Sequence, residues 1–232
     1  MGGGYWILII GIGLVSWLVQ MNLKRKFDKY SKIPLANGMT GKDVAELMLR
    51  ENGISDVQVE ATGGMLTDHY NPANKTINLS DGVYSSCSVA AAAVAAHETG
   101  HALQHAQAYA PLKLRSALVP AVNFSSKWVT WLLIGGMILM GNGSRFGFTV
   151  LAIAVALFGV TTLFSFITLP VEINASQRAL AWLSRSGITN SYNDAEARDA
   201  LKSAAYTYVV AAIGSLVTFL YYLMILLGGR RN

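Results

Sequence analysis

The chain has 232 residues, of which 53% are hydrophobic and 13% are charged, so it is too apolar for an ordinary soluble domain. Its net charge is +5, but the basic residues are not interleaved with aromatic residues on one face, which argues against a nucleic-acid partner. Cys87 is the only cysteine, which excludes an intrachain disulfide and a zinc site built from thiolates.

The first expected element is a nearly uncharged apolar run from Tyr5 to Leu23, long enough to cross a bilayer as a helix. It has no basic residue before its apolar core and no small-residue cleavage site after it, so we interpret it as a retained anchor. Five lysines and arginines follow within positions 24–32, more than the opposite side carries in Arg145, Arg230 and Arg231. By the positive-inside rule, the segment after this anchor faces the cytoplasm.

A soluble segment follows, from residue 24 to about 115, and it begins with a short helix and three strands. Thr40 and Asp43 have the spacing of a capping box, and Gly53 ends the helix that follows. Three short stretches separated by glycines and an Asn-Pro turn then predict a small antiparallel sheet, with strands at 57–60, 65–70 and 76–79. An exposed edge of this sheet could hold an extended peptide, although a purely structural hairpin explains the pattern equally well.

The central motif of this segment is H-E-x-x-H, formed by His97, Glu98 and His101. It follows an alanine-rich run that favours a helix, which we expect from about Ser86 to Tyr109. On a helix the two histidines lie one turn apart on the same face, where both can bind one zinc ion. Glu98 can then take a proton from a zinc-bound water, and the resulting hydroxide attacks an amide carbonyl.

The setting of this motif decides its interpretation, because the five-residue pattern also arises by chance in many proteins. With histidines counted as neutral, Glu98 is the only charged residue between Asp81 and Lys113, and three of the four histidines fall within nine positions. Polar groups on an otherwise apolar helix need a partner. A bound metal therefore explains the pattern better than hydrogen bonds within a core do.

Beyond this segment the chain alternates between apolar spans and polar stretches. Apolar spans are expected at 119–140, 146–169 and 205–227, with a polar turn at 141–145 and a second soluble piece at 170–204. Lys127 interrupts the first of these spans, where its ammonium group can reach the interface or face the protein interior.

Two histidines leave a catalytic zinc site incomplete, because such a site usually has three protein ligands and a water. His105 lies two turns after His97, and eight residues of straight helix rise about 12 Å, too far for both to share one ion with His101. His69 on the expected hairpin stays open. Glu172 is the favoured ligand, because two spans separate it from His101 and an even number of crossings returns it to the same side. The alternative is a carboxylate that only interacts with a helix dipole.

Three stretches resemble the YugP-type membrane zinc metallopeptidases: residues 95–105 around the H-E-x-x-H motif, Asp68–Pro72, and Leu169–Ser176. The order of spans also fits, so the resemblance covers nearly the whole chain. More distantly, the layout is similar to the HtpX-like membrane proteases, in which a glutamate after a transmembrane hairpin completes the zinc site. The resemblance implies that His97, His101 and Glu172 bind one zinc ion and that Glu98 is the catalytic base.

Two positions depart from the pattern of these families. This chain has Asn174 where the family commonly has Asp, and Ser176 where many related proteases carry an Asp that orients a ligand histidine. Both can accept a hydrogen bond from an imidazole N–H, but neither brings the negative charge that raises ligand basicity, so we expect a functional but weaker site. His69, Tyr70 and His105 are further candidates for orienting the ligands or the substrate.

Together these features predict a mainly α-helical integral membrane protein with four transmembrane helices and a small zincin-like α+β catalytic domain that contains the short antiparallel sheet. The transmembrane helices are expected at 5–23, 119–140, 146–169 and 205–227, and the cytoplasmic catalytic segments at 24–115 and 170–204. The expected function is that of a zinc-dependent metalloendopeptidase. It would hydrolyse proteins or peptides at the cytoplasmic face of a bacterial plasma (inner) membrane.

Two other functions stay open at this level. In a catalytically inactive scaffold, zinc would only tie the hairpin to the metal helix, and Glu98→Gln would leave function intact. A metal-binding or transport protein would require ionisable residues within the spans, where only Lys127, a poor cation ligand, is found. The expected partners are a protein or peptide substrate and the lipid bilayer, and a homo-oligomer or a membrane-protein partner is compatible with this reading.

Overall fold

A computed structural model of the protein describes residues 3–190 and 193–229, so Arg230 and Arg231 lie outside the described part of the chain. The described residues form two compact units. Within the described residues, the helical unit comprises 3–16, 114–169 and 208–229, and the α/β unit comprises 17–113, 170–190 and 193–207. In chain order the elements are α1 (Gly3–Tyr30), α2 (Gly41–Glu51), β1 (Gln58–Thr62), β2 (His69–Asn71), β3 (Thr76–Ser80), α3 (Asp81–Tyr84), α4 (Val89–Ala106), α5 (Ala110–Gly141), α6 (Arg145–Arg185) and α7 (Asp194–Gly229).

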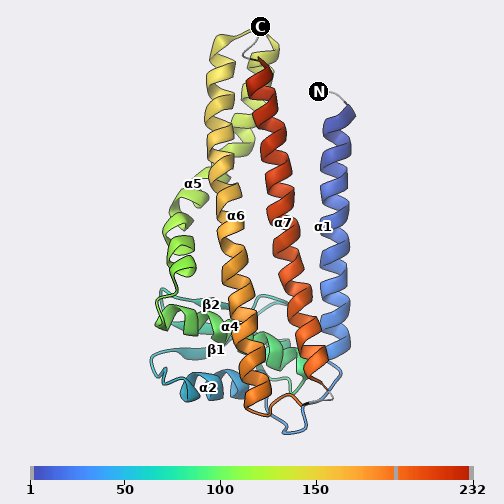
Figure 1. The fold of residues 1–232 in the computed structure, drawn as a ribbon, viewed down its shortest axis with the longest axis vertical. Helices are drawn as coiled ribbons and strands as arrows, with labels where there is room; N and C mark the ends of the chain where they lie inside the picture. Colours follow the sequence, from blue (N-terminus) through green and yellow to red (C-terminus); the bar gives the residue numbers. More distant parts are fainter. Residues whose placement is uncertain (1–2, 191–192, 230–232) are drawn as a thin grey trace. The chain divides into compact units, whose positions relative to one another are not determined.

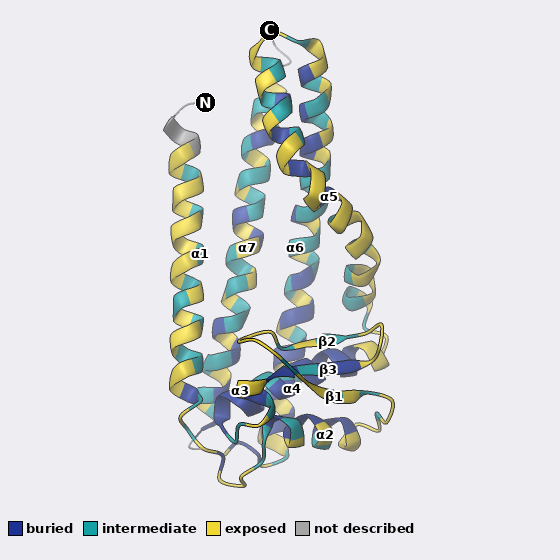
Figure 2. Cartoon of the chain, turned by 180° about the vertical axis from the view of Figure 1, so that it is seen from behind, coloured by how far each residue is buried: buried dark blue, intermediate teal, exposed yellow. Residues whose placement is uncertain are grey.

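Four of these helices, α1, α5, α6 and α7, are long and apolar enough to cross a membrane. About 20 helical residues span the hydrocarbon core of a bilayer, and α6 alone has 41 residues. Figure 1 shows α6 as one continuous helix. Large apolar side chains are exposed along α1, and Trp6 and Ile7 are 58% and 75% exposed (Figure 2). Such a surface is typical of a helix that faces lipid or another apolar partner.

Helix α6 continues well past the apolar span that the sequence predicts at 146–169. It runs through Pro170 and ends at Arg185. Proline removes one backbone N–H from the helix, but a helix can continue around it at the cost of that hydrogen bond. As a result, Glu172 lies on the same helix as the apolar span, three residues after its expected end.

In the helical unit, α5 and α6 approach each other closely at Gly136, where glycine has no side chain to keep them apart. A Cβ atom at Gly136 would lie 2.8 Å from the backbone nitrogen of Leu151, whereas one at the neighbouring Gly135 would meet nothing within 4 Å. The buried apolar cluster of this unit contains Val129, Leu133, Leu151, Ala154, Val155 and Tyr222.

The first helix that lies wholly within the α/β unit, α2, is one that the sequence predicts. The predicted capping box is confirmed: the N–H of Asp43 donates to Thr40 Oγ1 at 3.2 Å, and the N–H of Thr40 donates to Asp43 Oδ2 at 2.9 Å. These contacts satisfy two backbone donors at the start of α2. The buried large apolar side chains of this helix begin at Val44.

The prediction of an antiparallel sheet is wrong, because the sheet is mixed. Its strand order is β1-β3-β2, with β1 parallel to β3 and only β2 antiparallel to it. The strand expected at 65–70 is reduced to β2, because the loop before it has positive φ angles at Gly64 and Leu66. This loop carries the chain across to the far edge. β3 then takes the centre, where Ile77 and Leu79 are completely buried.

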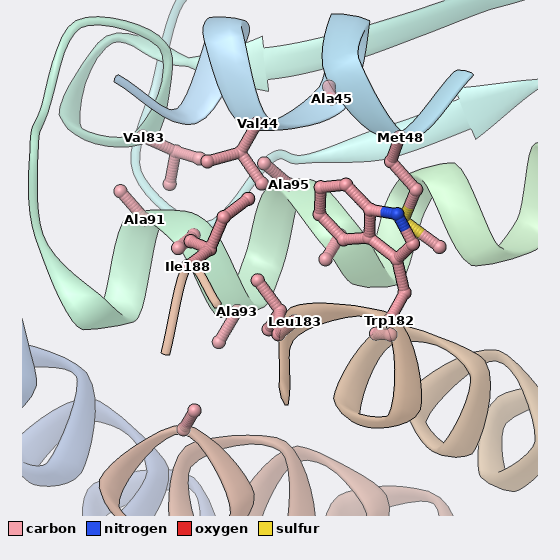
Figure 3. Close-up of a cluster of buried hydrophobic side chains, with 14 of the residues drawn as sticks. Val44, Ala45, Met48, Val83, Ala91, Ala93, Ala95, Trp182, Leu183 and Ile188 are labelled. Atoms are coloured by element: carbon pink, nitrogen blue, oxygen red, sulfur yellow. The ribbon is translucent and has the colours of Figure 1, made fainter. Parts of the chain in front are cut away.

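The core of the α/β unit is built around α4, whose alanine side chains are small enough to let other helices come close. Figure 3 shows Val44 and Met48 of α2 on one side of the α4 alanines, and Trp182 and Leu183 of α6 on another side. Met48 and Leu183 are completely buried. This packing holds α4 and the second half of α6 together, and these two elements carry the residues of the candidate site.

Candidate metal centre

Two histidines and one glutamate meet between α4 and α6. His97 Nε2 lies 3.3 Å from Glu172 Oε2, and His101 Nε2 lies 3.5 Å from the same oxygen. One ligand atom of each residue falls within 4.8 Å of the other two. His101 and Glu172 are buried and His97 is nearly so, so the three groups face one another away from bulk water.

The distances from the two histidine nitrogens to the glutamate oxygen fit a zinc ion held between the three side chains. Ligands placed tetrahedrally at zinc–nitrogen and zinc–oxygen distances of about 2.0–2.1 Å lie roughly 3.3–3.4 Å from one another. The two histidine–glutamate separations, 3.3 and 3.5 Å, are close to that value. Two imidazoles and one carboxylate are also the donor set of many catalytic zinc sites, in which water takes the fourth position. His97, His101 and Glu172 are therefore a chemically suitable zinc site.

Gly100 allows α4 and α6 to come this close. A Cβ atom at this position would lie only 2.7 Å from the backbone oxygen of Ala175, and 3.2 Å from its Cα atom. Ala175 follows Glu172 by one turn of α6, so the backbones touch beside the ligands. The glycine inside the H-E-x-x-H motif thus sets the distance between the two ligand-bearing helices.

A different side chain holds each histidine ring on the side away from Glu172. Ser176 Oγ lies 3.1 Å from His97 Nδ1, and Gln104 Oε1 lies 3.0 Å from His101 Nδ1. Asn174 contacts neither ring but accepts a hydrogen bond from Gln104 Nε2 at 3.0 Å. Sequence reasoning named Ser176 and Asn174 but missed Gln104. The signal for Gln104 was present, because it follows His101 by three positions on a predicted helix.

Negative charge surrounds His101. Burial lowers the pKa of its imidazole, but the Glu172 carboxylate, the charge of Glu98 and the contact with Gln104 raise it, and the net shift is upward. Carboxylates that stabilise a positive charge on the ring also stabilise a cation placed between that ring and Glu172. The electrostatics of the site thus favour a bound metal ion.

Glu98 is buried beside the cluster and is held by the sheet. Its Oε2 accepts a hydrogen bond from the backbone N–H of Tyr70 at 2.9 Å. Tyr70 belongs to β2, the edge strand of the sheet, and this N–H belongs to the edge that does not pair with β3. The predicted hairpin is therefore next to the predicted catalytic base, and one group of its edge is already bound to that base.

The other two histidines lie outside the ligand cluster. His105 Nδ1 is 2.7 Å from the hydroxyl of Tyr70, and both side chains help to line a cavity of about 160 Å³. His69 is exposed, and its Nδ1 lies 2.8 Å from the backbone oxygen of Thr67. The helical rise that argued against His105 as a third ligand agrees with this arrangement.

Comparisons with known proteins point to the same chemistry. The sequence profile of the family described as “Putative neutral zinc metallopeptidase” matches residues 5–227. The chain is 41% identical over 224 residues to “Putative membrane protease YugP” of Bacillus subtilis (strain 168), which covers 97% of this chain and 96% of that protein. No solved structure matches the chain.

Proposed function

Because this chain belongs to the family described as “Putative neutral zinc metallopeptidase”, we propose that it is a membrane-embedded zinc-dependent metalloendopeptidase. The observation that carries this proposal is the group formed by His97 Nε2, His101 Nε2 and Glu172 Oε2, with a buried carboxylate, Glu98, beside it. The alternative of a catalytically inactive scaffold uses the same three ligands but gives Glu98 no chemical role.

The proposed mechanism assigns one task to each residue. His97, His101 and Glu172 would hold one zinc ion, which supplies a water of lowered pKa and polarises the scissile carbonyl. Glu98 is the general base. Its Oε2 is held by the Tyr70 N–H, so we assign Oε1 as the atom that takes the proton and later passes it to the leaving amine.

We place the substrate along the edge of β2 that does not pair with β3, where the N–H of Tyr70 is already bound to Glu98. An extended peptide can add to an edge strand through main-chain hydrogen bonds, and β2 lies at the edge of the sheet directly beside Glu98. This position would bring a peptide bond to the base without any contact specific to one side chain. We therefore propose that the substrates are proteins or peptides and that the enzyme has little preference for their sequence.

We also propose a location for this chemistry. The four apolar helices would cross a plasma membrane, and residues 24–115 and 170–204 would form the catalytic domain on its cytoplasmic face. The five basic residues within positions 24–32 support this orientation. Glu172 follows the apolar stretch of α6 by three residues, which would place the active site near the membrane surface.

The decisive experiment is proteolysis of an unfolded substrate by the detergent-purified protein, with zinc content measured on each variant. Glu98→Gln should keep its zinc and lose about 10²–10⁴-fold in rate, because it removes only the general base. Glu172→Ala should lose zinc and activity together. Glu46→Gln, which changes an exposed carboxylate on α2, serves as the control and should leave both unchanged.

Each alternative result has a definite meaning. If Glu98→Gln cleaves as fast as the unaltered protein, Glu98 is not the base and the proposed mechanism is wrong. If Glu172→Ala retains zinc, the third ligand is a different residue. A protein that binds zinc but cleaves no substrate at all supports the scaffold.

A further inference from the structure

Gln104 is completely buried one turn after His101, and its amide group contacts three other residues on α4 and α6. Its Oε1 lies 3.0 Å from His101 Nδ1. Its Nε2 donates to the backbone oxygen of Val171 at 2.8 Å and to Asn174 Oδ1 at 3.0 Å. A buried amide with every polar atom engaged has little freedom to rotate.

The partners of this amide fix which way it points. The backbone oxygen of Val171 can only accept, so the atom that faces it must be the NH₂ group of Gln104. Asn174 Oδ1 is fixed in the same way, because it also accepts from Arg178 Nε at 2.7 Å, and a guanidinium group can only donate. The oxygen of Gln104 therefore faces His101, and it can only accept.

This orientation decides the tautomer of His101. Because Gln104 Oε1 accepts, His101 Nδ1 must carry the hydrogen, and in a neutral ring Nε2 then keeps its lone pair. Nε2 is the atom that faces Glu172. The hydroxyl of Ser176, which contacts His97, can either donate or accept and so leaves the tautomer of His97 undetermined.

The same amide also connects the two helices that carry the ligands. Its donor group binds the carbonyl of Val171, the residue directly before Glu172 in α6 and 67 positions away from Gln104 in the chain. One side chain thus touches a histidine ligand on α4 and the backbone beside the glutamate ligand on α6.

We propose that Gln104 is the positioning residue of the metal centre, which keeps His101 in its zinc-binding tautomer and holds the Glu172 backbone at a constant distance from that ring. This inference rests on the proposed zinc function of His97, His101 and Glu172. Gln104 touches neither substrate nor reacting atoms, so its effect is expected first in metal binding.

The test is the zinc affinity of the detergent-purified protein, measured by competition with a chromogenic chelator. Gln104→Leu keeps the approximate size of the side chain but removes both the hydrogen-bond acceptor and the donors. We expect zinc binding to weaken about 10–100-fold. Gln104→Glu loses both donors but gives His101 a charged acceptor, which raises the basicity of the ring and offsets part of the loss. Its affinity should therefore lie between that of Gln104→Leu and that of the unaltered protein. Cobalt substitution gives a second measurement, because the visible absorption of the bound ion reports the geometry of its ligands.

Thr99→Val is the matched control. Thr99 is also completely buried on α4, but its hydroxyl bonds only to the backbone oxygen of Ala95 within the same helix. Thr99→Val should lower the unfolding temperature, because it removes a buried hydrogen bond. It should keep the zinc affinity and the cobalt spectrum of the unaltered protein. A merely structural role for Gln104 would give the same pattern as this control.

The outcomes separate the two proposals. If the unaltered protein binds zinc and Gln104→Leu binds it as tightly as Thr99→Val does, the positioning role is wrong and the zinc site stands. If Gln104→Leu does not fold, Gln104→Glu carries the test, and an affinity equal to that of Thr99→Val overturns the inference. If the unaltered protein binds no zinc, the proposed function fails and this inference fails with it.

Discussion

At the scale of single residues, the site holds its two histidines with neutral groups. His97 contacts the hydroxyl of Ser176, and His101 contacts the amide of Gln104. A carboxylate in such a position raises the basicity of the ligand ring, and a hydroxyl or an amide does so less. The charge that favours a cation comes instead from Glu172 and Glu98, which both act electrostatically on His101.

Two aspartates in the α/β unit have opposite pKa shifts, and they provide a test of its pH dependence. Burial is the main cause that raises the pKa of Asp68 above its ordinary value of 3.8, although Ser80 donates to it and opposes the shift. Hydrogen bonds from Thr40 lower the pKa of Asp43 below the same value. Asp68 therefore stabilises the fold below its ordinary pKa and loses this contribution as pH rises. Asp43 stabilises the fold above its ordinary pKa and loses this contribution as pH falls.

The expected result follows from these signs. Asp68→Asn should raise the unfolding temperature at pH 7, because an amide can still accept from Ser80 but carries no buried charge. Asp43→Asn should lower the unfolding temperature at pH 7 and have less effect below pH 3.8. Thermal unfolding of the detergent-purified protein from pH 8 down to about pH 3 measures both. A destabilised Asp68→Asn at pH 7 would show that the charged form of Asp68 is favoured after all.

At the scale of elements, the most important property of α4 is the small size of its side chains. Its alanines and Gly100 let α2 and α6 approach its backbone, and this close packing brings Glu172 to the two histidines. Longer side chains at these positions would separate the helices. The same run of small residues therefore serves both the core and the site.

Gly100→Ala tests this close approach. Alanine favours a helix by about 1 kcal/mol over glycine, so propensity alone predicts a more stable α4. The new Cβ atom would lie 2.7 Å from the backbone oxygen of Ala175, however, and α6 would have to move away with Glu172. We expect zinc binding to weaken about tenfold or more. Gly82→Ala is the control, because its Cβ atom would meet nothing within 4 Å. Unchanged zinc affinity in Gly100→Ala would mean that the helices can separate without disturbing the ligands.

The hairpin of α5 and α6 offers a second test, with two adjacent glycines. Gly136→Val should destabilise the protein by about 1–3 kcal/mol, because its Cβ atom would lie 2.8 Å from the Leu151 backbone nitrogen. Gly135→Val, at the neighbouring position, has open space and should be nearly neutral. The unfolding temperature in detergent distinguishes the two variants. Equal losses for both would show that β-branching within α5, and not contact with α6, is the cause.

At the scale of the whole molecule, the chain combines a helical unit with an α/β unit, and all four apolar helices continue from one unit into the other. α6 is the clearest case, because a single helix carries an apolar stretch and then Glu172. Glu172 follows the end of the expected apolar span by only three residues in the sequence, and this short spacing is the reason that the proposal puts the active site close to the membrane surface.

The proposed orientation can be tested by labelling single cysteines in intact cells. In a Cys87→Ala background, Asn142→Cys lies in the turn between α5 and α6, and Asn37→Cys lies in the loop before α2. We expect a membrane-impermeant maleimide to label position 142 in intact cells and position 37 only after the membrane is opened. Both positions are exposed, so burial does not limit the reaction. The reverse labelling pattern would place the catalytic domain outside the cell.

The sequence by itself determined the features that depend on local periodicity. Helical spacing placed His97 and His101 on one face, the alanine run predicted the helix, and unbroken apolar stretches predicted the four long helices. Counting the apolar spans also predicted that Glu172 lies on the side of the histidines, and the structure brings the three side chains together. Each of these inferences uses residues a few positions apart, or only the order of the spans.

Only the tertiary structure decided which groups meet across long separations in the chain. Ser176 and His97 are 79 positions apart, Gln104 and Val171 are 67 apart, and Tyr70 and Glu98 are 28 apart. The parallel pairing of β1 with β3 belongs to the same class, because burial of the central strand and the path of a loop set it. Such contacts result from how whole elements pack against one another, and the local periodicity of a sequence contains no record of that packing.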